Sequence, residues 1–225
     1  MDAKAIESGL HTAFAGKSIL ITGQLFSEAE RYTYYSTNKF LASEKDSSAI
    51  WISTDTPYDK IKERFAEYNF PLEPIHNGKS PRGTLHLLDL ISYKAGVTRK
   101  KCDDCRYIQD PSNLTELALA IKEIMADKKC GLLVLDSLNS LLVYNDLTKT
   151  LQFLRFLSAS AYEKKMALLI YFVSGERDPR TETSIKMATD AVLSFEHDHL
   201  MLQSGTSQKS FSFDFSGSKL RLSHP

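Results

Sequence analysis

Short runs of apolar residues recur along the chain, and stretches with helical character separate them. Five of these runs have the length of a strand and are rich in leucine and β-branched residues. They cover residues 18–22, 49–53, 84–91, 131–136 and 167–173. Because these runs are apolar almost without interruption, we expect strands that are covered on both faces, as in a parallel sheet.

Capping residues indicate where helices begin between these strands. Ser27 and Asn113 are each followed three positions later by a glutamate, which is the pattern of a capping box. Thr56 stands before Pro57, a residue that is favoured in the first helical turn. A fourth segment carries leucine at helical spacing. The predicted helices are 27–43, 56–69, 113–127 and 146–164.

The C-terminal part of the chain has a different pattern. Apolar and polar residues alternate in 200–202, 211–215 and 220–222, and Gly205 and Gly217 lie between these segments. This alternation predicts an antiparallel hairpin or meander at one edge of the sheet. Strands that alternate with helices predict an α/β fold with a mostly parallel, doubly wound central sheet, in a single domain over residues 1–225.

Composition and charge narrow the class of protein. Of the 225 residues, 42% are hydrophobic and 25% are charged, as is usual for a globular protein. Lys+Arg and Asp+Glu both number 28, so net charge provides no overall attraction to nucleic acid or to an anionic membrane. The chain has three cysteines, no signal peptide and no apolar run that could span a bilayer. We therefore expect a cytoplasmic protein.

The first strand is followed by a glycine turn and a helix, which is the arrangement of a phosphate-binding loop. Gly23, Gln24 and Ser27 occupy this turn. The motif G-x-x-x-x-G-K-[ST], however, is absent. Glu28 and Glu30 instead lie in the first helical turn, where the helix dipole would otherwise attract a phosphate. These carboxylates would repel a triphosphate, so we expect the site to be filled by the protein's own side chains.

Asp136 closes the fourth apolar run and is followed by Ser137. An aspartate at this place orients magnesium and its waters in enzymes with a phosphate-binding loop. Aspartate is also common at strand ends as a helix cap or turn residue. The residue pattern alone leaves both interpretations open.

The order of these segments resembles the RecA/KaiC-like superfamily, particularly its archaeal KaiC-related members. The similar segments are 50–57, 87–92, 113–117, 133–142, 151–157 and 189–195, and together they span nearly the whole chain. The resemblance implies a three-layer fold in which 133–142 corresponds to the Walker B segment. It also implies a nucleotide pocket, in vestigial form, at Gly23, Gln24, Ser27, Asp55, Asp136 and Ser137.

Three parts of the family's ATPase apparatus are missing. The Walker A segment is unrecognisable between residues 23 and 36. Asp55, between two threonines, stands where the family has paired glutamates that activate water. The basic pair that reaches a neighbour's phosphate would fall near 202–204, which carries no charge. These departures imply a degenerate ATPase without catalytic residues, ATP or magnesium.

The resemblance therefore suggests a regulatory or assembly module that acts through protein contacts or self-association, for example in signal transduction. Two other functions stay open. One is an active ATPase or nucleotide sensor that uses Asp136 for magnesium and Asp55 as base. The other is a nucleic-acid-binding assembly subunit, as in the RecA-like Elongator subunits. The loop with Arg99, Lys100, Lys101 and Arg106 is its basic feature, although such a loop is usually a solvated turn.

Two weaker patterns could bind a metal, and we expect that neither does. Cys102 and Cys105 form a lone C-x-x-C, for which free thiols on an exposed loop are the expected state. A zinc site would need Cys130 and a histidine to converge on this pair. His197 and His199 are two positions apart beside acidic residues, a pattern that is more typical of a polar hairpin turn.

Overall fold

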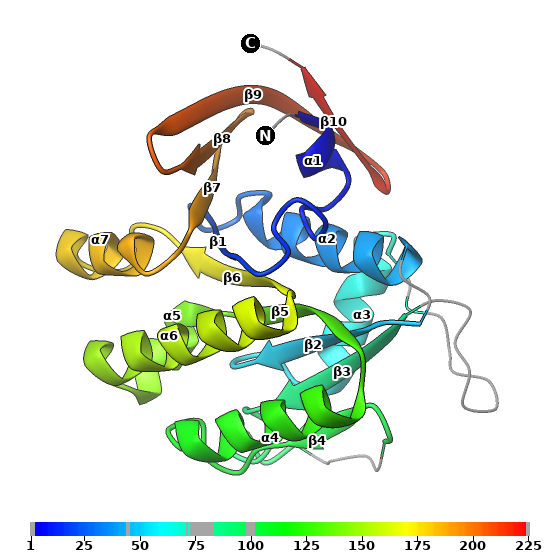
Figure 1. Cartoon of the computed structure of the whole chain (residues 1–225), viewed down its shortest axis with the longest axis vertical. Coiled ribbons are helices and arrows are strands. Elements are labelled where there is room, and N and C mark those ends of the chain that lie inside the picture. Colours follow the sequence, from blue (N-terminus) through cyan, green and yellow to red (C-terminus); the bar gives the residue numbers. More distant parts are fainter. Residues whose placement is uncertain (1–2, 44–45, 71, 73–82, 98–101, 224–225) are drawn as a thin grey trace.

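The computed structural model describes residues 3–43, 46–70, 72, 83–97 and 102–223 (Figure 1). The strands are β1 (Ser18–Gly23), β2 (Ser48–Ser53), β3 (Thr84–Asp89), β4 (Cys105–Tyr107), β5 (Cys130–Asp136), β6 (Ala167–Val173), β7 (Ala191–Glu196), β8 (His199–Ser204), β9 (Ser207–Ser216) and β10 (Lys219–Ser223). The helices are α1 (Ala3–Glu7), α2 (Ala29–Ser43), α3 (Tyr58–Glu67), α4 (Leu114–Asp127), α5 (Leu138–Tyr144), α6 (Leu147–Lys164) and α7 (Pro179–Met187).

The described strands form one ten-stranded sheet in the order β10-β9-β8-β7-β1-β6-β5-β2-β3-β4. The strands from β7 to β4 in this order are parallel, and β8, β9 and β10 extend the sheet in antiparallel fashion beyond β7. The α/β fold class, the mostly parallel centre and the antiparallel C-terminal edge are therefore confirmed. All five predicted central strands lie in the same sheet.

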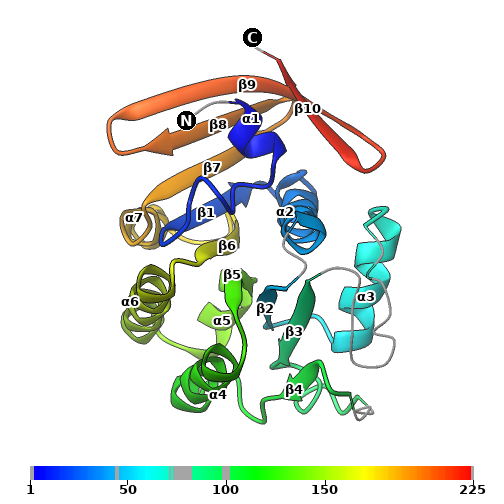
Figure 2. The same cartoon turned by 45° about the vertical axis from the view of Figure 1, so that its right-hand side comes forward.

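Helices cover both faces of the sheet, which gives three layers (Figure 2). One hydrophobic core joins α1, α2 and α3 to the sheet and is rich in aromatic rings. The second core joins α4, α5, α6 and α7 to the opposite face. Every residue of β1 and β6 is buried because helices cover both of their faces. The carboxyl ends of the parallel strands meet at one side of the sheet, which carries the candidate site.

The helix starts agree with the predictions at two places and differ at two others. Asn113 caps α4 through its side chain, as the capping box predicts, and α6 follows its N-cap Asp146, where the predicted helix begins. The predicted cap by Thr56 is wrong. Pro57 is the N-cap residue of α3, and its side chain makes no capping hydrogen bond. The Tyr58 N–H donates instead to the buried Asp89 carboxylate on β3, at 2.8 Å. The predicted capping box at Ser27 is also incomplete, because Glu30 pairs with Arg64 of α3.

Candidate functional site

The turn between β1 and α2 forms one wall of a cavity of about 390 Å³. Gly23, Gln24 and Ser27 line it, together with Lys186 from α7 and the end of β7. Gly23 lies so close to the turn that a Cβ atom built on it would be 2.2 Å from the Ser27 Oγ. The position therefore requires glycine because of this close approach rather than because of an unusual backbone angle. The structure brings together three of the six predicted pocket residues here.

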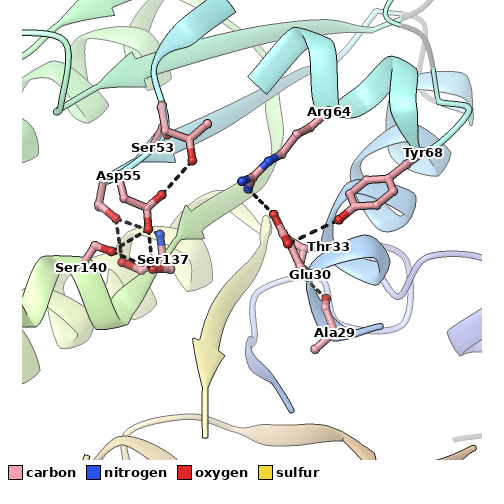
Figure 3. A network of polar contacts seen from close by, with 11 residues as sticks. Ala29, Glu30, Thr33, Ser53, Asp55, Arg64, Tyr68, Ser137 and Ser140 are labelled. Carbon is pink, nitrogen blue, oxygen red and sulfur yellow. Dashed lines mark hydrogen bonds and ion pairs between the residues drawn. The ribbon is translucent and has the colours of Figure 1, made fainter. Parts of the chain in front are cut away.

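The first turn of α2 carries the residues that would correspond to the end of a phosphate-binding motif. Counted from Gly23, the motif would place its second glycine at Glu28, its lysine at Ala29 and its hydroxyl at Glu30. The Glu30 carboxylate forms an ion pair with Arg64 of α3 and accepts a hydrogen bond from the Tyr68 hydroxyl at 3.3 Å (Figure 3). A guanidinium from the protein's own chain thus neutralises the carboxylate at the position of the magnesium-binding hydroxyl.

The second carboxylate of this turn is paired as well. Glu28 lies 3.4 Å from the Arg31 guanidinium, which also donates to the Gly217 carbonyl at 2.8 Å. The turn therefore contains two ion pairs and no lysine. Its side chains satisfy one another's charges without an external anion or cation.

Asp136 ends β5 beneath the first turn of α2 and is 3% exposed. Its Oδ2 atom makes no hydrogen bond of normal geometry, and neither do the buried Trp51 Nε1 and Tyr34 hydroxyl. The Trp51 N–H still lies near enough to the Asp136 carboxyl to oppose part of the rise in its pKa. Burial raises the pKa of the Asp136 carboxyl well above its ordinary value, and the charges of Asp55 and Glu30 raise it further. The raised pKa favours the neutral carboxyl, which is a poorer ligand for magnesium than a carboxylate.

Asp55 and Ser137 meet at the ends of β2 and β5. The Asp55 carboxylate accepts hydrogen bonds from the hydroxyls of Ser140 at 2.6 Å and Ser137 at 3.2 Å (Figure 3). The buried Thr54 hydroxyl accepts from the Ser137 N–H and donates to its carbonyl, each at 2.8 Å. Asp55 therefore ties two loops together through hydrogen bonds from hydroxyl groups.

The six predicted pocket residues thus divide into three groups. Gly23, Gln24 and Ser27 line the cavity, Asp55 and Ser137 form the network with Ser140, and Asp136 is buried between these places. These residues do not fit an ATP–magnesium complex held in the manner of a phosphate-binding loop. The loop offers no lysine, its hydroxyl position is a paired glutamate, and burial raises the pKa of the aspartate.

Sequence reasoning missed the residues that hold this region together. Arg64 and Tyr68 lie on a helix with several other charged residues, so no local signal distinguishes them. Asp89 accepts four hydrogen bonds, from the N–H groups of Tyr58, Ile91 and Ser92 and from the Ser92 hydroxyl. Its signal was available, because an aspartate that closes an apolar run is a frequent capping residue.

The weaker candidates differ in outcome. Cys105 begins β4, so the predicted loop position is wrong for it, whereas Cys102 lies in the loop three residues earlier. Both thiols are free and half-buried, and the Cys102 thiol lies 3.8 Å from the Cys105 carbonyl oxygen. The short strand was missed because three residues, one of them an arginine, make no apolar run.

The predicted hairpin turn at the two histidines is confirmed. His197 lies in the turn between β7 and β8, with a φ of 51°, and His199 begins β8. In the predicted basic loop, Arg99, Lys100 and Lys101 lie outside the described residues. Arg106 pairs with Glu123 on α4.

Two findings on the described residues concern metals and membranes. No three histidine, cysteine or acidic side chains among them are grouped so that they could hold a metal ion. None of the helices in this part of the chain is long and apolar enough to cross a membrane. The absence of bound zinc at the cysteine pair stays a prediction, which metal analysis of protein purified without chelator tests.

Solved structures from an archaeon share the fold. An uncharacterised protein from Pyrococcus horikoshii, PH0321, in complex with an unknown peptide, is 19% identical with a TM-score of 0.67, over 93% of this chain and 92% of that chain. The KaiC-like protein PH0186 from Pyrococcus horikoshii OT3 is 13% identical with a TM-score of 0.57, over 93% of this chain and 90% of that chain.

These likenesses show a RecA/KaiC-like fold. No curated protein matches the sequence significantly. A family model matches residues 1–204, from α1 to the end of β8, and so the chain belongs to the family of unknown function DUF7090.

Proposed function

We propose that this protein is a RecA/KaiC-like domain without ATPase activity, which acts through protein contacts as a regulatory or assembly module. The ion pair between Glu30 and Arg64 is the observation that carries the proposal. It puts a paired carboxylate where an active domain needs a hydroxyl for magnesium, directly after Ala29 at the position of the lysine. In this proposal the Walker A segment is degenerate and the protein works in the cytoplasm.

The loss of affinity for ATP follows from the missing contacts. A lysine on the terminal phosphates and a hydroxyl on magnesium are charge-assisted contacts worth roughly 1.5–3 kcal/mol each. Without both, about 3–6 kcal/mol is absent, which corresponds to a factor of about 10²–10⁴ in affinity. The raised pKa of the buried Asp136 carboxyl disfavours the ionised form that magnesium binds. A micromolar nucleotide site would therefore become millimolar or weaker.

Two observations support a role in protein contacts. The solved structure of PH0321, which has the same fold, contains a bound peptide. In this chain, Leu25 and Phe26 are exposed by 57% and 96% at the tip of the turn after β1. Exposed apolar side chains that adjoin one another are typical of surfaces that bind other proteins. Self-association and a role in signal transduction belong to the same proposal.

Isothermal titration with ATP and magnesium tests the loss of nucleotide binding. We expect no saturable binding below about 1 mM. A dissociation constant in the low micromolar range that is abolished by Asp136→Asn would overturn the proposal. Ser216→Ala serves as the control, because Ser216 lies at the far end of β9 and outside the cavity.

A second candidate function is suggested by one residue of the cavity. Lys186 lines it opposite the turn after β1 and could neutralise a phosphate that the turn itself cannot. In this alternative the protein is a nucleotide sensor or ATPase with an atypical phosphate site. Nucleotide binding that is lost in Lys186→Ala and kept in Lys219→Ala would favour it, since Lys219 lies on the edge strand β10.

A further inference from the structure

A groove of about 550 Å³ runs between α4 and α6, on the face of the sheet opposite to α2 and α3. Figures 1 and 2 show these two helices as neighbours on that face. The groove is lined by the first residues of α4 and by the side chains of both helices that face each other. These residues are Ser112, Asn113, Leu114, Thr115, Ala118, Leu119, Lys122, Lys149, Gln152, Phe153 and Phe156.

The floor of the groove is apolar. The Phe153 and Phe156 rings are stacked with their centroids 5.9 Å apart, and Phe153 is only 5% exposed. Leu119 on the facing helix is 56% exposed, although it lies beside these rings. An exposed leucine next to an aromatic floor gives apolar surface that a second molecule can cover.

The two charged side chains that line the groove are both lysines, while the carboxylates of Glu116 and Asp146 contact lining residues from outside it. Lys122 lies over the Phe156 ring at 5.5 Å, and Lys149 lines the groove on the other helix. No aspartate or glutamate is among the residues that line the groove. The nearest acidic partner of Lys149 is Asp146 at 3.5 Å, an exposed pair that contributes little. The groove thus complements a segment that combines apolar and acidic side chains.

The length of the groove and its two helical walls define the room for that segment. Thr115, Leu119 and Lys122 recur at helical spacing on α4, and so do Lys149, Phe153 and Phe156 on α6. The stretch from Leu114 to Lys122 is about 12 Å long, or roughly two helical turns. An amphipathic helix buries its apolar face in a groove of this kind through residues at i, i+3 or i+4, and i+7.

We propose that the groove between α4 and α6 binds an amphipathic helix of a partner protein, with apolar residues on its buried face and acidic residues on its flanks. The inference rests on the proposed function in one respect, that the protein acts through protein contacts. It does not depend on the absence of nucleotide binding. It identifies the kind of partner, which the turn at Phe26 and the cavity do not.

A peptide selection tests this proposal. A phage library of peptides of about 16 residues, roughly four helical turns, is selected on the full-length protein. Selected sequences are synthesised with a fluorophore and titrated by anisotropy. We expect acidic sequences with apolar residues at i, i+3 or i+4, and i+7. Leu119→Glu should weaken their binding by at least about tenfold, as should Lys122→Glu combined with Lys149→Glu.

A matched control separates the groove from general surface effects. Val143 on α5 is 69% exposed and lies outside the groove, so Val143→Glu should leave the affinity within about twofold. Circular dichroism of each variant establishes that it is folded. Basic or neutral selected peptides, equal binding to Leu119→Glu, or no selected peptide would each overturn the proposal.

Two further results distinguish this inference from self-association and from the proposed function. If Leu119→Glu converts a dimer to a monomer in sedimentation, a second copy covers the groove and the proposal is wrong. Titration of ATP into the same protein tests the proposed function separately. Micromolar ATP binding with intact peptide binding would overturn the proposed function alone. Loss of peptide specificity without ATP binding would overturn only the proposal that the groove binds a helix.

Discussion

Replacing Asp136 by asparagine tests whether the carboxyl at the end of β5 is neutral in the folded protein. The substitution keeps the shape of the side chain and removes its ability to ionise. Asp136 is 3% exposed, its Oδ2 makes no hydrogen bond of normal geometry, and burial raises its pKa well above the ordinary value. We expect Asp136→Asn to be at least as stable as the wild type at pH 7, because the wild-type carboxyl must take up a proton when the chain folds and the asparagine needs none.

The dependence on pH has a defined sign. In the unfolded chain the carboxyl ionises near pH 3.9, whereas the folded protein keeps its proton to higher pH. Unfolding therefore releases a proton above about pH 5, and raising the pH favours unfolding by at most about 1.4 kcal/mol per pH unit. Between about pH 5 and pH 7 the wild type should lose up to about 2.7 kcal/mol relative to Asp136→Asn.

Urea unfolding of both proteins at a series of pH values measures this difference. Trp51 is the only tryptophan of the chain and lies near Asp136, so its fluorescence reports the transition. Asp89→Asn is a matched control, because Asp89 is equally buried but accepts four hydrogen bonds. It should be destabilised by about 2 kcal/mol or more.

The reasoning is refuted if the difference between the two proteins does not change with pH. It is also refuted if the wild type gains stability over Asp136→Asn as the pH rises. Either result would mean that the folded carboxyl is ionised, and an ionised Asp136 could bind a cation.

Three further predictions concern the same region and the thiols. Double-mutant cycles with Arg64→Met and Glu30→Gln, followed by urea unfolding, should give a coupling of about 1 kcal/mol, because the pair is partly exposed. Gly23→Ala should lower the unfolding free energy by about 1–3 kcal/mol, and Ser27→Ala should restore part of it by removing the Oγ. Burial raises the pKa of the Cys105 thiol, so an alkylating reagent should modify it slowly at pH 7 in the folded protein and quickly in urea.

The central strands could be predicted because strands buried on both faces appear in the sequence as continuous apolar runs. All residues of β1 and β2 are buried, so both strands are uninterrupted runs of small or apolar residues. Helix α7 has no apolar pattern that would predict it, because Ile185 is its one buried residue. Strand β4 pairs only with β3 and has an exposed arginine at its centre.

The site was predictable only as far as neighbours along the chain determine it. The missing lysine and the acidic turn could be read directly from residues 23–30. The partner of Glu30 could not, because Arg64 lies 34 positions away and reaches it from another helix. The raised pKa of Asp136 likewise depends first on burial and then on charges that the fold brings near it from α2 and the β2–α3 loop.

The place of β1 in the sheet has a consequence for synthesis on the ribosome. Its two neighbours, β6 and β7, come from the last third of the chain. The 150 residues from the end of β1 to the end of β6 take about 8–30 s to translate at roughly 5–20 residues per second. Throughout that time a buried, mostly apolar strand has neither of its native neighbours, and unpaired strands of this kind aggregate readily. Completion of the sheet centre therefore depends on slow, long-range pairing.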